Sequence, residues 1–439
     1  MNIRTFIICF LISVTIPVFA QKKPEKWDLA TCINYALVNN IQIQKSKINL
    51  EQSNVNVKLA KAQLYPNLSA SVGQNFINRP FLLADDEQAN TYRGNYGVSS
   101  SMTLFNGGIL VRNIRQQKLQ EEVSNYAILA AEKNIEMAIL QVYMQILYAT
   151  EAINVNKETV KTSQYQRDRG EALLQAGSIS KVELAQLEAQ LSSNKYLLVS
   201  AENTLSLAKL QLRQLLELKL EDEIDIVIPQ IKEQEILKPL PDLVSIYQVS
   251  LNVMPQLKSS RLNTDITKIG TEIAKGGYYP KVSLTASAGT SHFSESFLSF
   301  GDQLRDNFND GVGVTVNIPI FTNRGNKSAV ESARLNERTA KLNLQEAEKN
   351  LLAELETVYQ DALSAQSQYI SASENVRALQ ISYNLFEQQF NLGMRNTLDM
   401  LTEKNNLLVA LQNQLQAKYM SIMNAQLLNL YQDLPIEIK

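Results

Sequence analysis

An internal repeat constrains the fold of this chain more than any other feature of its sequence. Four short motifs recur in the same order at offsets of 214 to 216 residues: Asp28-Leu29 and Asp242-Leu243, Tyr65-Pro66 and Tyr279-Pro280, Phe105 and Phe321, Gly177 and Gly393. The offset is about half of the 439 residues, whereas solenoid repeats recur every ~20–50 residues. The chain therefore reads as a tandem duplication of one large unit.

Each half shows the order helix, two strands, long helix, turn, helix. Apolar periodicity predicts helices over residues 28–64, 108–176, 178–218, 242–278, 326–391 and 395–432. Gly177 and Gly393 stand where the long helices must end and the chain must reverse, and glycine adopts the left-handed backbone of such turns at little cost.

The predicted organisation has five parts. Residues 1–20 form a signal peptide, 21–220 the first repeat, 221–241 a connector, 242–432 the second repeat and 433–439 a tail. Arg4 precedes an apolar run that ends near the small residue Ala20, as in secretory signals. An N-terminal anchor helix is the alternative, but the run is short and Pro17 interrupts it. We therefore expect export.

The long helix predicted over residues 326–391 carries two apolar stripes. The first steps by three and four residues through Leu344, Ala347, Leu351, Leu355, Val358, Ala362, Ala365, Tyr369, Ala372, Val376, Leu379, Tyr383, Phe386 and Phe390. The second includes Leu352, Tyr359, Leu363, Ile370, Ile381 and Leu385. Two stripes imply two helical neighbours, as in a hollow helical tube. An elongated coiled-coil rod is the alternative on the helices alone.

Four predicted strands favour a membrane barrel over the rod. Apolar residues alternate with small or polar ones over residues 68–73, 96–104, 282–289 and 311–320. Aromatic residues flank these strands: Tyr65, Phe76, Tyr92, Phe105, Tyr279, Phe293, Phe308 and Phe321. Aromatic rims around an apolar face are typical of outer-membrane barrels. Residues 78–90 and 294–306 are then expected to be loops at the outer surface.

Four strands cannot close a barrel, and lipid does not tolerate open sheet edges. Two protomers would supply eight strands and a filled interior, whereas three would supply twelve and leave room for a pore. The small and polar partner faces of the strands favour the open pore.

The composition excludes several classes of function. The chain has one histidine, His292, and two cysteines, which is too few for Cys/His zinc sites or most catalytic triads. The formal net charge of −2 gives no support for nucleic-acid binding. No GxxxxGK[ST] phosphate-binding loop is present. We expect no enzyme activity, no metal and no cofactor. The main rival function is a structural periplasmic coiled-coil or adaptor protein.

The pattern as a whole resembles the TolC-like outer membrane efflux proteins. The resemblance rests on the signal peptide, the duplicated element order, the two Tyr-Pro joins, the run Phe105-Asn106-Gly107-Gly108 and the turn that begins at Gly393. It implies a trimeric, 12-stranded outer-membrane barrel, four strands per protomer, continued by a long periplasmic α-helical barrel in a Gram-negative cell. It implies an exit duct of a tripartite efflux pump or type I secretion system. The implied partners are a periplasmic adaptor protein and an inner-membrane RND or ABC transporter.

The resemblance also implies roles for residues near the two glycines. Asp399 matches an acidic pore constriction, and Arg395 with Glu183 matches a gate latch, meaning polar contacts that hold the tip closed; Gly177 and Gly393 match the turns of that tip. Two positions depart from the family pattern. Thr402 replaces a second aspartate and Phe390 replaces a tyrosine, so a less anionic constriction and a simpler latch are expected.

Overall fold

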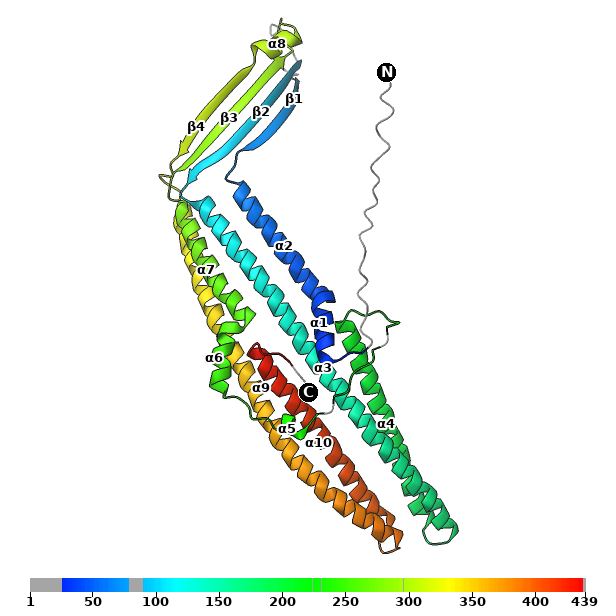
Figure 1. The fold of residues 1–439 in the computed structure, drawn as a ribbon. Coiled ribbons are helices and arrows are strands. Elements are labelled where there is room, and N and C mark those ends of the chain that lie inside the picture. The colour runs from blue at the N-terminus through cyan, green and yellow to red at the C-terminus, as the bar shows by residue number, and fades with distance from the viewer. Residues whose placement is uncertain (1–25, 79–89, 223, 230, 295, 437–439) are drawn as a thin grey trace, which may run out of the picture.

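The computed structural model describes residues 26–78, 90–222, 224–229, 231–294 and 296–436. A four-stranded sheet lies at one end, and long helices run from it to two turns at the opposite end, each of which connects a pair of helices (Figure 1). The helices are α1 (Leu29–Asn39), α2 (Ile41–Ala62), α3 (Ile109–Gln175), α4 (Lys181–Leu215), α5 (Glu233–Ile236), α6 (Leu243–Val253), α7 (Pro255–Gly276), α8 (Phe300–Asp306), α9 (Gly325–Asn391) and α10 (Thr397–Tyr431). The strands are β1 (Asn67–Asn78), β2 (Asn90–Asn106), β3 (Lys281–Phe293) and β4 (Asn309–Asn317).

The helices of the two halves match in length. Helices α1 and α6 each have 11 residues, α2 and α7 each have 22, α3 and α9 each have 67, and α4 and α10 each have 35. Equal lengths at corresponding places are what a duplicated unit predicts.

Two of the predicted helices are each broken in two, so the prediction of continuous helices over residues 28–64 and 242–278 was wrong. Asn40 has an extended backbone, its side chain accepts a hydrogen bond from the Gln42 amide at 2.9 Å, and it starts α2 as an N-cap. At the corresponding place, Pro255 is the first residue of α7. Proline lacks an N–H and disfavours helix at the residue before it, which ends α6.

The sheet has the order β1-β2-β3-β4, and every pair of neighbours is antiparallel. The register places apolar residues together across the sheet, as in the row Ala70, Val98, Ala288. The opposite face is small and polar: Ser69 pairs with Ser99, and their hydroxyls lie 2.9 Å apart. The predicted alternation is therefore confirmed.

Many apolar side chains of this sheet are solvent-exposed in the protomer. They include Leu68, Val72, Phe76, Val98, Val312, Val314 and Val316. A soluble sheet would cover such a face with a second layer. In the described part of the chain no helix is long and apolar enough to cross a bilayer.

Two details at the ends of the sheet differ from the prediction. Residues 294–306 were expected to form a loop, but they contain α8, whose N-cap Ser299 accepts a hydrogen bond from the Asp302 amide. Strand β4 ends at Asn317, before the predicted end at 320, because Pro319 has no N–H for the ladder. The other predicted loop, 78–90, falls mostly outside the described residues, as does the predicted signal peptide.

The largest core lies where the connector wraps the helices, around residues such as Trp27, Leu140, Tyr143 and Leu212. Trp27 pairs with Ile226 of the connector in an isolated parallel β-bridge. The connector thus joins the first residues of the described chain to the middle of the long helices.

Helices α3 and α4 form one antiparallel hairpin, and α9 and α10 form a second one beside it (Figure 1). The first predicted stripe of α9 supplies most of its buried residues, among them Leu355, Ala362 and Tyr383. By contrast, Leu363, Ile370, Ile381 and Leu385 of the second stripe remain exposed in the protomer. Within the chain α9 therefore packs against α7 and α10, and this second stripe is left uncovered.

Candidate functional site

The end of the molecule opposite the sheet consists of the two turns that close the hairpins. Gly177 has φ +70° and Gly393 has φ +73°, in the left-handed region that side chains with a Cβ rarely adopt. After α3, the Ser178 amide donates to the Leu173 carbonyl at 2.8 Å, and after α9 the Met394 amide donates to the Gln389 carbonyl at 2.9 Å. Each helix thus ends in a hydrogen-bonded turn that requires this backbone conformation.

Glu183 caps the helix that returns from the first turn. Its carboxylate accepts a hydrogen bond from the Ser180 amide at 2.8 Å, while the Ser180 hydroxyl accepts one from the Glu183 amide. This reciprocal pair is a capping box. The bond from the Ser180 backbone, and the others that the carboxylate accepts, lower the pKa of Glu183 below its ordinary value.

Arg395 and Asp399 lie together at the second turn. The Arg395 guanidinium is 3.5 Å from the Asp399 carboxylate, donates to the Gln389 side chain at 3.1 Å and lies over the Phe386 ring. Asn396 caps α10 by accepting a hydrogen bond from the Asp399 amide at 2.8 Å. Both charged side chains are partly exposed to solvent, Arg395 by 45% and Asp399 by 37%.

Within one protomer Arg395 pairs with Asp399 and not with Glu183. Glu183 instead accepts hydrogen bonds from Ser180 and Thr397. One contact between the two hairpin ends is made by Thr397, whose hydroxyl donates to Glu183 at 3.4 Å. Thr397 is fully buried, so it holds the start of α10 against the start of α4. The Arg395–Glu183 latch remains a prediction, as does the acidic constriction at Asp399.

The sequence analysis missed a buried polar cluster two helical turns from the tip. Lys404 of α10 is only 6% exposed, and its ammonium donates to Ser163 at 2.7 Å and to the Gln166 side-chain oxygen at 2.8 Å. The Gln166 amide in turn donates to the Tyr383 hydroxyl at 3.0 Å. We call the set Ser163, Gln166, Asn194, Tyr383, Glu387 and Lys404 the lysine cluster.

A sequence signal for this cluster does exist. Lys404 occupies one position of a stripe that otherwise runs through Thr397, Met400, Leu407 and Leu411 at spacings of three and four residues. A lysine in such a stripe is either buried with polar partners or marks a break in the packing. The stripe marks the lysine but not its partners, which come from other helices.

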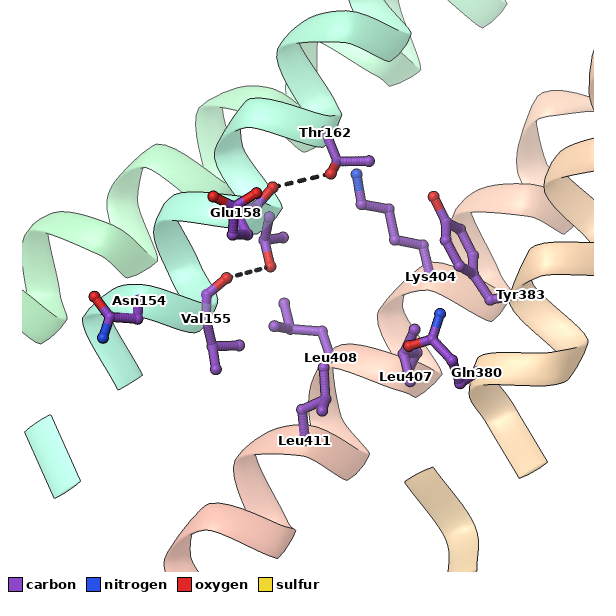
Figure 2. Close-up of a pocket in the computed structure, with 11 residues that line it drawn as sticks. Asn154, Val155, Glu158, Thr162, Gln380, Tyr383, Lys404, Leu407, Leu408 and Leu411 are labelled. Atoms are coloured by element: carbon purple, nitrogen blue, oxygen red, sulfur yellow. Dashed lines mark hydrogen bonds between the residues drawn. The ribbon is translucent and has the colours of Figure 1, made fainter. Parts of the chain in front are cut away.

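A groove of about 460 Å³ lies between the two hairpins and reaches Lys404. Figure 2 shows Lys404 and Tyr383 on one side of it, facing Thr162 and Glu158 of α3. Its remaining walls are largely apolar, with Val155, Leu407, Leu408 and Leu411. Among the described residues no group of three or more His, Cys, Asp or Glu side chains is placed to hold a metal ion.

Comparison with known proteins gives a consistent result. The family model described as "Outer membrane efflux protein" matches residues 32–217 and 246–432. The chain is 20% identical over 373 residues to the outer membrane efflux protein BepC of Brucella suis, which covers 85% of this chain and 78% of that protein. It is 22% identical over 407 residues to the outer membrane protein TolC of Escherichia coli, covering 89% and 78%.

Solved structures share the fold. The crystal structure of CusC, described in terms of folding and transmembrane channel formation, aligns with a TM-score of 0.81 at 18% identity. The alignment covers 94% of this chain and 95% of CusC. The whole described architecture, sheet and helical hairpins together, therefore matches that of a known channel protein.

Proposed function

The chain belongs to the outer membrane efflux protein family, and we propose from this that it forms the outer-membrane exit duct of a tripartite efflux pump or type I secretion system. In this role it conducts substrates passively, and the energy comes from a partner in the inner membrane. The relatives named above are outer-membrane and efflux proteins by their descriptions, which supports the same location here.

The observation that carries the proposal is the four-stranded sheet with an exposed apolar face and two free edges. Among the described residues, strands β1 and β4 each pair on one side only. Unpaired backbone groups cannot face hydrocarbon, so a membrane sheet must close on itself. Three protomers would close a 12-stranded barrel whose apolar face meets lipid and whose serine- and glycine-rich face lines water.

The helices support the same assembly. The exposed second stripe of α9 offers an apolar surface that a neighbouring protomer would cover. Helices α3 and α9 have 67 residues each, or about 100 Å at ~1.5 Å per residue, enough to extend far into the periplasm. The tip turns would then lie farthest from the outer membrane, where a periplasmic adaptor and an RND or ABC transporter would dock.

The proposal is tested by reconstituting the purified protein in planar lipid bilayers. An exit duct gives stepwise conductance that persists without any nucleotide, and the protein requires detergent to stay in solution. A structural periplasmic coiled-coil protein would remain soluble without detergent and would give no conductance. The second result would overturn the proposal.

A further inference from the structure

The lysine cluster joins all four helices of the two hairpins. From α10, the Lys404 ammonium reaches Ser163 and Gln166 of α3. From α4, the Asn194 amide donates to the same Ser163 hydroxyl at 2.6 Å. The Gln166 amide continues the network to α9 through Tyr383 and, at 3.4 Å, through Glu387. Separation of the two hairpins near the tip must break the bonds of Lys404 to α3 and those of Gln166 to α9, whereas the Asn194–Ser163 bond lies within one hairpin.

The hydrogen-bond partners of the Lys404 ammonium are neutral groups, Ser163 and Gln166. In the described part of the chain Lys404 forms no ion pair with a carboxylate. Glu387 of α9 is the charged group that acts on it, but that carboxylate accepts its hydrogen bonds from Tyr383 at 2.8 Å and from Gln166. A buried ammonium held by neutral groups alone loses much of its hydration energy.

The other groups around Lys404 are neutral or more distant. Tyr383 of α9 stays protonated because burial raises the pKa of its hydroxyl. Helix α4 supplies only the neutral Asn194, and α3 supplies Glu158 at the far side of the groove. On α10 itself, Glu403 accepts a hydrogen bond from Ser382.

We propose that Lys404 is a gating residue whose buried ammonium makes the packed arrangement of the two hairpins less stable and so lowers the free energy needed to separate them at the tip. The gating role rests on the proposed function, whereas the separation of the hairpins can be measured without it. In the packed arrangement the amine is enclosed by Ser163 and Gln166, with the groove beside it (Figure 2). When the hairpins move apart, water enters along the groove and hydrates the ammonium.

This arrangement couples hairpin separation to a proton. Burial lowers the pKa of Lys404 to about 8 in the packed arrangement, whereas a hydrated lysine titrates near its ordinary value of 10.5. Between these two values the separated arrangement holds a proton that the packed one lacks. Stability of the packed arrangement therefore rises as the pH increases from about 8 to 10.5, and its destabilisation by the charge is complete below about 8.

The test compares wild type with Lys404→Met, which keeps the length and volume of the side chain and removes its charge. Lys161→Met is the matched control, because Lys161 lies on α3 near the same tip but its side chain is 79% exposed. Spin labels at Asp168 on α3 and Asn384 on α9 report the separation of the hairpins in detergent-purified protein. Single-channel recording reports opening in bilayers.

For wild type and Lys161→Met, we expect the ratio of separated to packed hairpins to fall roughly 25-fold between pH 7 and 9.5, as pKa values of about 8 and 10.5 require. For Lys404→Met, we expect mostly packed hairpins at both pH values and fewer openings at pH 7. A wild-type ratio that does not change with pH, or one that changes equally in Lys404→Met, would overturn the proposal.

The two readouts separate this proposal from the proposed function. A wild-type protein without any conductance would contradict the exit duct, while the spin-label distances would still decide the role of Lys404. If Lys404→Met does not fold, the wild-type pH series of distances decides alone: packed hairpins at pH 7 in the same proportion as at pH 9.5 contradict the proposal.

Discussion

At the scale of single residues, two carboxylates at equivalent helix starts have different surroundings. Glu183 and Asp399 are each the third residue of a helix that follows a tip turn. Glu183 accepts hydrogen bonds from the Ser180 amide and from Thr397, and the capping box engages it. Asp399 has Arg395 as its charged partner and remains partly exposed. The predicted constriction at Asp399 therefore involves a partly exposed carboxylate whose charge Arg395 partly offsets.

The turn at Gly393 requires glycine for its backbone conformation and not because a side chain would lack room. A Cβ added there would meet nothing within 4 Å, but φ is +73°. We expect Gly393→Ala to lower the free energy of unfolding by roughly 1–2 kcal/mol, and Gly393→Asn by less. Gly301→Ala is the control, since its space is equally open and its φ is not in this region. Equal changes in thermal stability for Gly393→Ala and Gly301→Ala would contradict this explanation.

The charged pair at the second turn gives a prediction for conduction. If three copies of Asp399 surround one axis, Asp399→Asn should lower the preference for cations over anions. Arg395→Ser should loosen the closed tip and raise the conductance, because serine is too short to make the contacts of Arg395 with Gln389 and Phe386.

Reversal potentials in a salt gradient measure the cation preference, and single-channel conductance measures the loosening. Asp168→Asn, an exposed carboxylate on α3 near the tip, is the control. Unchanged selectivity in Asp399→Asn, or the same loss in Asp168→Asn, would rule out the constriction at Asp399.

At the scale of helices and strands, the apolar stripes of α9 divide into an inner and an outer set. Val376 and Leu379 pack against the core that contains Tyr383, Phe390 and Met400. Ile381 and Leu385 are 57% and 52% exposed. The inner set stabilises the protomer, and the outer set is available to a neighbour.

This division predicts two different defects. Leu379→Asp buries a charge within the protomer and should lower its stability by a few kcal/mol. Leu385→Asp should leave the protomer folded but weaken its assembly with other copies. Circular-dichroism melting and size-exclusion chromatography in detergent separate the two effects. Normal assembly of Leu385→Asp would show that this stripe faces water.

Local patterns in the sequence predicted the long elements well. The stripes of α9 and the alternation in β1 to β4 are periodic over many residues, and each period reports one kind of packing. The breaks at Asn40 and Pro255 were missed because the apolar pattern continues across them while single residues reset the backbone. Helix α8 is short, and its contacts, such as Gln303 to the Phe293 amide, depend on a strand already in place.

The candidate site was predictable only in part, because some of its features are local in the sequence and others depend on tertiary contacts. Glycine at 177 and 393 reports a local backbone requirement, which the sequence displays directly. The lysine cluster joins residues from four helices, among them Ser163, Asn194 and Lys404, which are distant in the sequence. Such a network follows from tertiary packing, and no local pattern on one helix contains it.

At the scale of the whole molecule, both the sheet and the long helices leave apolar surface uncovered in the protomer. In the part of the chain that the structure describes, the sheet has two unpaired edges and an exposed apolar face, and the long helices leave an apolar stripe uncovered. Pairing the free edge of β1 with that of β4 from another copy would satisfy both edges, and helices packed beside one another would cover the stripe. Closure of one assembly therefore accounts for both exposed surfaces.

The mass of the detergent-solubilised particle tests this central claim most directly. Light scattering with correction for bound detergent, or native mass spectrometry, measures the number of protomers. The account predicts one species with three times the protomer mass, which dissociates only together with loss of the β-sheet signal. A stable folded monomer, or a dimer with eight strands, would contradict it.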